Sequence, residues 1–382
     1  MISKIKRFAL RRTIVFDPDK YRDRIAESKK RLAITRRFEE PDRVPVTIST
    51  AGSFYSRLFG YNIRDYYTDL DTCIDVQLKG LDWAYEELQD DRTGYGLHLD
   101  LGPISEGLYF GFPIEYPDDT SPWVHKALET PAQIEDFQVP DPAESPGIQE
   151  AYRKIEQFKD RVKERGTNLP AGGGIGIHPP LSCACALAEP ELIYTLMYEE
   201  PALIHRFFGK LLDAFCRLVD YQDSLRGRKT ESTGLADDHS AFVSNPMYRE
   251  FVYPCNMAIY ERYGLKGRHL HADGPNDHHF GMYANDMKLT SMDIGGFSDI
   301  ANAKPALQGK TVFSGGLNCR DLYYDLATAK PVIDRAIRIG GPGGGFILAV
   351  GGETYVGVNP ETLIQSVAYA KEAGRYPISP MV

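Results

Sequence analysis

Five short apolar runs recur in the second half of this 382-residue chain, and helical stretches separate them. Each run ends in polar or glycine residues, at 236–238, 271–274, 293–296, 314–316 and 351–353. A repeated strand–helix order builds a parallel sheet through right-handed crossovers. The chain length suits eight such units with insertions. We therefore expect the α/β class and, within it, a (β/α)8 TIM barrel whose strand ends face the active site.

The alternative architecture is a doubly wound sheet, which typically opens with G-x-G-x-x-G after its first strand. No such motif follows an opening strand here, and neither glycine cluster, 172–174 or 340–345, is followed by the Lys-Ser/Thr of a P-loop. We expect two parts, a basic N-terminal arm and helix over residues 1–40 and the barrel with its insertions over residues 41–382.

Charge and hydropathy limit the partners of this chain. Forty-four Lys and Arg residues face 53 Asp and Glu residues, and the net charge of −9 argues against an extended nucleic-acid footprint. No apolar run approaches the ~18 residues of a membrane span, and the charged start does not resemble a secretory signal. We expect a soluble, cytoplasmic protein. The six cysteines follow no regular spacing, so structural disulfides are not expected.

Polar side chains gather at the predicted strand ends, where a barrel would bring them to one mouth. Strand alternation places His271 and Asp273 on one face, and a core would not tolerate them unpaired, so we expect them to be functional. His269 lies deeper and is expected to be a satisfied structural histidine. The full set at the strand ends is Asp237, Asp238, His239, His269, His271, Asp273, Asp293, Asn318 and Glu353.

Two further features have open interpretations. The adjacent Asp237 and Asp238 point to opposite faces, so at most one of them is expected to face the mouth. Phe54 and Tyr55 belong to an aromatic cluster soon after the first predicted strand. This cluster is suited either to a flat substrate or to ordinary loop packing.

Several motifs together resemble the uroporphyrinogen decarboxylase superfamily, from about residue 22 to the end. They are D-R-V-P-V at 42–46, Thr130-Pro131 with Asp136, A-D-D at 236–238 and Y-R-E-F-V-Y-P at 248–254. His271-x-Asp273-Gly274 stands where the corrinoid-dependent methyltransferases of the superfamily have His-x-Cys-Gly. Gly351-Gly352 stands where they have a Gly-Cys.

The sequence departs from two branches of this superfamily. True uroporphyrinogen decarboxylases hold substrate carboxylates with an R-Q-A-G-R segment, whereas residues 47–55 here contain no arginine. The thiol-activating methyltransferases bind zinc through one His and two Cys, and only His271 is kept. Exchanging thiolate for carboxylate makes a metal site harder and better suited to polarising oxygen. The resemblance therefore implies the branch that moves a methyl group from a methyl ether, often a methoxylated aromatic, to Co(I) of a corrinoid.

The resemblance also implies roles for individual residues. His271, Asp273 and either Asp237 or Asp238 would form the catalytic electrophile at the ether oxygen. The ligands of a possible zinc ion would come from His271, Asp273, Asp237 and Glu250, because Glu250 reproduces a Glu-x20-His spacing of some members. The residues expected to bind substrate are Phe54, Tyr55, His239, Asn318 and Glu353.

The corrinoid is expected on a separate partner protein that docks over the mouth. Residues 277–281, D-H-H-F-G, fall one residue short of the Asp-x-His-x-x-Gly of corrinoid-binding domains. A homodimer is implied by likeness, with the basic arm as a contact. Two alternatives remain open. One is a metal-assisted lyase or decarboxylase of a small carboxylated substrate, which needs Arg268 or Arg320 to face inwards. The other is a non-catalytic barrel that binds a corrinoid protein.

Overall fold

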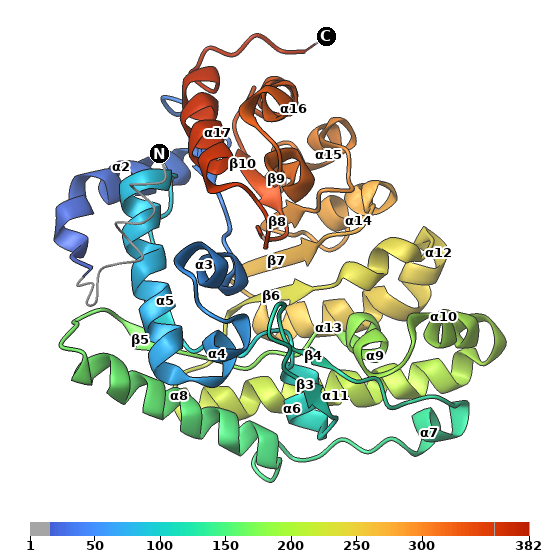
Figure 1. Ribbon diagram of the computed structural model, residues 1–382. Coiled ribbons are helices and arrows are strands. Elements are labelled where there is room, and N and C mark those ends of the chain that lie inside the picture. Colours follow the sequence, from blue (N-terminus) through green and yellow to red (C-terminus); the bar gives the residue numbers. More distant parts are fainter. Residues whose placement is uncertain (1–15, 355, 382) are drawn as a thin grey trace.

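Eight parallel strands form the centre of the computed structural model, which describes residues 16–354 and 356–381 (Figure 1). One sheet joins six of them in the order β1-β10-β9-β8-β7-β6, and β2 pairs with β5 in a second sheet. Their bounds are β1 (Val46–Thr47), β2 (Leu97–His98), β5 (Ala171–Gly172), β6 (Ser232–Ala236), β7 (Gly267–Ala272), β8 (Ser291–Ile294), β9 (Val312–Asn318) and β10 (Phe346–Gly351). The expected α/β barrel class is confirmed, with no strand–strand ladder among the described residues at two seams, β1–β2 and β5–β6.

A helix follows nearly every strand and covers the outside of the sheet (Figure 1). Residues 346–350 of β10 are all buried, as expected for a parallel strand packed on both faces. Within the described ranges no helix is long and apolar enough to cross a membrane. The helices after the last six strands are α11 (Pro201–Arg226), α13 (Tyr253–Tyr263), α14 (Phe280–Asn285), α15 (Ile300–Leu307), α16 (Leu326–Gly340) and α17 (Pro360–Ala373).

The insertions lie in the first half of the chain. Residues 1–15 of the expected basic arm lie outside the described residues, and the helix α2 (Arg22–Thr35) lies within residues 1–40, where the sequence predicts a helix. The short strands β3 (Ile114–Glu115) and β4 (Trp123–Val124) form an antiparallel pair. The other helices are α3 (Gly52–Phe59), α4 (Ile63–Thr68), α5 (Leu70–Trp83), α6 (Ser105–Phe110), α7 (Pro131–Asp136), α8 (Pro146–Glu164), α9 (Pro180–Leu187), α10 (Pro190–Glu199) and α12 (Asn245–Met247).

Two adjacent aspartates take the place of strand pairing at the β1–β2 seam. The Asp91 carboxylate accepts the Val46 backbone N–H at 2.8 Å, and the Asp90 carboxylate accepts the Ile48 N–H at 2.9 Å. Asp91 also binds Arg31 and Arg43, each at 2.7 Å, and so ties α2 to the barrel. Burial favours a raised pKa for Asp91, but the bond and charge of Arg43 outweigh burial and lower the pKa overall.

We expect Asp91→Ala to lower the free energy of unfolding by about 3 kcal/mol, because it leaves the largely buried Arg43 guanidinium without its carboxylate partner, whereas Arg31 keeps Asp42. Since the folded-state pKa of Asp91 is lowered, the stabilisation is present above the unfolded-state value. It is lost as pH falls through the folded-state value. Urea denaturation measures both effects. Glu150→Ala, which removes an exposed pair with Arg153, serves as the control and should change little. Equal urea midpoints for the two variants would contradict the assignment.

Candidate active site

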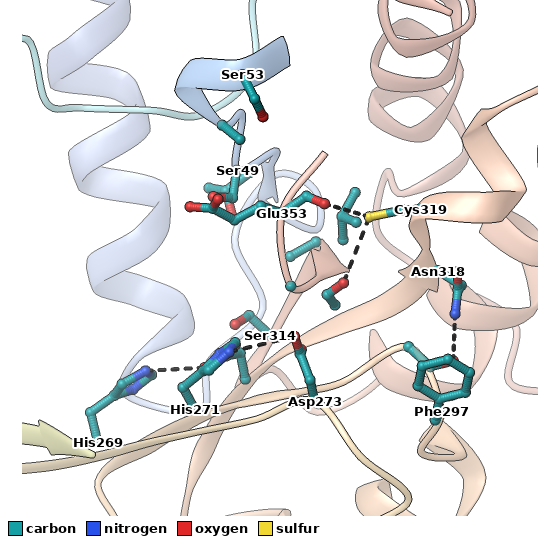
Figure 2. Close-up of a pocket in the computed structure, with 18 of the residues that line it drawn as sticks. Ser49, Ser53, His269, His271, Asp273, Phe297, Ser314, Asn318, Cys319 and Glu353 are labelled. Carbon is teal, nitrogen blue, oxygen red and sulfur yellow. Dashed lines mark hydrogen bonds and ion pairs between the residues drawn. The ribbon is translucent and has the colours of Figure 1, made fainter. Parts of the chain in front are cut away.

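A cavity of about 840 Å³ opens at the carboxyl ends of the strands (Figure 2). Most barrels fill this space with bulky branched side chains. Here the lining positions on β1, β9 and β10 are small, including Thr47, Ser314 and Ala349, so the interior stays hollow. Polar side chains from β7 and β8, among them His271 and Asp293, reach this space.

Asp293 connects the two histidines of β7. One carboxylate oxygen accepts a hydrogen bond from His271 Nδ1, and the other lies 3.1 Å from His269 Nε2 (Figure 2). Burial opposes ionisation of Asp293, but these imidazoles outweigh it and lower its pKa to about 2. His269 Nδ1 also lies 3.0 Å from Ser291 Oγ, so both of its nitrogens have partners.

Three possible metal donors face one another beside this pair. His271 Nε2 lies 3.7 Å from Asp238 Oδ1 and 3.6 Å from Asp273 Oδ2, and the three donor atoms lie within 4.8 Å of one another. Burial favours a lowered pKa for His271, but hydrogen bonding and charge interactions with Asp273 and Asp293 raise the pKa to about 11. Asp273 Oδ1 is buried without a hydrogen-bond partner among the described residues. An orphaned carboxylate oxygen beside an imidazole and a second carboxylate fits a divalent cation.

Gly352 leaves the space that the Asp273 carboxylate occupies. A Cβ at position 352 would lie 2.8 Å from Asp273 Oδ2, and Gly352 has φ +73°, a conformation that other residues rarely adopt. A side chain at 352 therefore competes for the space that the Asp273 carboxylate occupies. The carboxylate at 273 and the glycine at 352 are therefore sterically linked.

Two predicted metal ligands do not join the group of Asp238, His271 and Asp273. Asp237 is fully buried behind it, where its carboxylate accepts hydrogen bonds from Ser182 Oγ and Asn256 Nδ2, both at 2.8 Å. Burial raises the pKa of Asp237 to about 6, although both hydrogen bonds oppose this. Glu250 lies in a helical turn after β6, and its half-exposed carboxylate faces His205 Nε2 at 3.7 Å. The sequence spacing of Glu250 therefore does not place it beside His271.

The predicted substrate-binding residues divide between the cavity and its surroundings. Phe54 packs in the core against Trp83, with ring centroids 5.8 Å apart, and lines neither described cavity. Tyr55 lines a second cavity of about 270 Å³. His239 does not line the main cavity. Its Nδ1 lies 3.2 Å from the Tyr194 hydroxyl.

Asn318 and Glu353 do line the main cavity. The Asn318 amide is already engaged, because Oδ1 accepts the Arg320 N–H at 2.9 Å and Nδ2 donates to the Gly296 carbonyl at 3.2 Å. Glu353 enters the cavity from the segment after β10, and its backbone carbonyl accepts a hydrogen bond from Cys319 Sγ at 2.6 Å (Figure 2).

Cys319 is a lining residue that the strand-end pattern missed. The pair of Glu106 with His178 lies near the site, where burial opposes a raised pKa of His178 but Glu106 and the charges of Asp238 and Asp237 raise it. Cys319 lines the cavity, and burial raises its pKa to about 11, so it is a neutral thiol at pH 7. Glu106 is 1% exposed, and one of its oxygens accepts from both the backbone N–H and Nδ1 of His178, at 2.7 and 2.8 Å. The histidine directly before Pro179 was the available signal for this pair, but its distance from the short strand β5 hid its place at the strand ends.

The comparisons with known proteins agree with this fold. A family model for uroporphyrinogen decarboxylase (URO-D) matches residues 27–373. The uroporphyrinogen decarboxylase of Shewanella piezotolerans is 24% identical over 286 residues, 71% of this chain and 72% of that protein. That of a Picosynechococcus species is 23% identical over 244 residues, 60% and 64% respectively. A solved structure of a methyltransferase from Methanosarcina mazei has a TM-score of 0.64 at 15% identity, covering 90% of this chain and 98% of that chain. The chain therefore belongs to the uroporphyrinogen decarboxylase family.

Proposed function

We propose that this chain is a corrinoid-dependent methyltransferase that takes a methyl group from a methyl ether, a methoxylated aromatic compound, and passes it to Co(I) of a separate corrinoid protein. The observation that carries the proposal is the group of Asp238, His271 and Asp273 at a hollow barrel mouth. This set offers one nitrogen and two carboxylate oxygens, and it contains no thiolate. Such a hard donor set favours chemistry at oxygen over chemistry at sulfur.

The proposed reaction breaks the CH3–O bond and forms a CH3–Co bond. Co(I) supplies the electron pair for the new bond, and the ether oxygen leaves with the pair of the old bond as a phenolate. This developing negative charge must be stabilised in the transition state. A zinc ion bound by Asp238, His271 and Asp273 would supply a Lewis acid for that oxygen. Asp293 holds the His271 imidazole through Nδ1 and so keeps Nε2 directed at the two ligating carboxylates.

The cavity does not suit the porphyrin carboxylates that the decarboxylases of the family bind. The segment where those enzymes carry arginines contributes Thr47, Ser49, Ala51 and Ser53 to the lining. Neither arginine that the lyase alternative requires lines the cavity: Arg268 donates to the Met287 carbonyl at 2.9 Å, and Arg320 lies among the exposed residues after β9. An anionic substrate would therefore meet the acids of the cavity without a Lys or Arg side chain to bind it.

Exposed aromatic side chains at the strand ends support a protein partner. Phe242, Phe297 and Tyr324 are 65%, 75% and 63% exposed, and they belong to the segments after β6, β8 and β9. Apolar groups left exposed around a cavity are typical of an interaction surface. A corrinoid protein that docks there transiently would bring its cobalt to the bound ether. The homodimer stays a prediction.

We expect the purified protein to methylate a Co(I) corrinoid protein when a methoxylated aromatic compound is supplied. The absorption spectrum of the corrinoid should change from that of Co(I) to that of methyl-Co(III), and the demethylated phenol should accumulate in equal amount. Heat-denatured protein is the control. If no ether, amine or thioether methylates the cobalt, the proposal is wrong, and docking without methylation would favour the non-catalytic barrel.

The neighbouring aspartates offer a matched test of the metal site. We expect one zinc ion per chain, a loss of zinc affinity of about 10–100-fold in Asp238→Asn, and no retained zinc in His271→Ala. Asp237→Asn and Glu250→Gln should keep the metal, because neither side chain joins the three donors. Metal analysis after dialysis against a weak chelator measures the content. Equal zinc in wild type and His271→Ala would refute the ligand assignment.

A further inference from the structure

A second, smaller cavity adjoins the main one. Its volume is about 270 Å³, and Ser49, Ala51 and Glu353 line both spaces. The smaller cavity lies at the β1–β2 side of the barrel, where its other polar lining includes Tyr66, Gln77, Arg92, His98 and Asp100. A ligand whose reacting oxygen lies near His271 therefore has space beside it for further ring substituents, and Glu353 stands where the two spaces meet.

No Lys or Arg side chain is free to face either cavity among the described lining residues, and His271 is already paired with three aspartates. Arg92 is the one Lys or Arg in the two linings, and its Nε donates to the Asp90 carboxylate at 2.6 Å. Its other nitrogens donate to the Ile48 carbonyl at 3.1 Å and the Tyr55 hydroxyl at 3.3 Å. A carboxylate on the ligand would therefore be desolvated without an available partner.

The Glu353 side chain is an available acceptor where the two cavities meet. Asp100 is already engaged, because its two oxygens accept from the Tyr66 hydroxyl at 3.0 Å and the Gly102 N–H at 2.9 Å. No side-chain hydrogen bond of Glu353 is formed with the described residues, and Figure 2 shows its side chain reaching across the cavity above His271 in that view, toward Ser49. Burial and the nearby Asp100 carboxylate raise the pKa of Glu353, as expected for a carboxylate without a donor.

We propose that Glu353 determines specificity by accepting a hydrogen bond from a hydroxyl group of the methyl donor, so that the preferred donor is an uncharged methoxyphenol. A hydroxyl on the ring supplies the donor that Glu353 lacks. A ring carboxylate would meet Glu353, Asp100 and Asp273 without a free Lys or Arg to pair with it. This inference rests on the proposed function.

Three probes of similar size test this inference in methyl transfer to a Co(I) corrinoid protein. Wild type should use 2-methoxyphenol with a higher kcat/KM than 1,2-dimethoxybenzene, and 4-hydroxy-3-methoxybenzoate should be the poorest. Glu353→Gln should lower kcat/KM for 2-methoxyphenol about 10-fold, mainly through KM, because the hydrogen bond to a charged acceptor is replaced by a weaker neutral one. It should leave 1,2-dimethoxybenzene unchanged. Glu372→Gln, at an exposed surface pair, is the control.

Calorimetric binding of 1,2-dihydroxybenzene, which has no methyl group to transfer, separates this inference from the proposed function. Wild type should bind it about 10-fold more tightly than Glu353→Gln does. The role of Glu353 would be overturned, with methyl transfer intact, by any of three results. These are equal affinities of wild type and Glu353→Gln for 1,2-dihydroxybenzene, an equal loss of kcat/KM for both neutral ethers in Glu353→Gln, and a higher wild-type kcat/KM for the benzoate than for 2-methoxyphenol. If no probe is demethylated, the proposed function fails, and the binding comparison still decides the role of Glu353.

Discussion

One carboxylate shared by two imidazoles determines the geometry of the site. Asp293 lies level with His271 in the parallel pairing of β7 and β8, so the register of the sheet itself brings them together. Because Asp293 accepts a hydrogen bond from Nδ1 of His271, Nε2 is the nitrogen left to face Asp238 and Asp273. If the strands slipped by one residue, His271 would move to the other face of the sheet and the three donors would separate.

Periodicity along the strands was sufficient to predict the barrel class and the meeting of His271 with Asp273, because both follow from strand order and side-chain alternation. Periodicity did not predict which of Asp237 and Asp238 faces His271. The strand β6 ends at Ala236 and the backbone then turns into a short helix, where side-chain alternation no longer applies. The prediction that Glu250 lies beside His271 was wrong for a similar reason. Its spacing to His271 is a property of the sequence, whereas its direction depends on a helical turn formed outside the barrel.

Family membership and the chemistry of the site are separate conclusions for this chain. The relatives named by sequence are decarboxylases, and the structural neighbour is a methyltransferase, so the shared barrel alone does not choose between them. The choice depends on a few side chains. Serine, threonine and alanine on the β1 side offer no cationic group for several carboxylates, while Asp273, beside the small Gly352, presents carboxylate oxygen to His271.

The β1–β2 seam gives this barrel a join made by side chains. The two aspartates that bridge it bind single backbone N–H groups and demand no continuous ladder, so loop length there can drift between relatives without breaking a sheet. The smaller cavity lies beside this join. Changes in the loops at this join can therefore reshape the smaller cavity while the histidine–aspartate pairing between β7 and β8 stays in place.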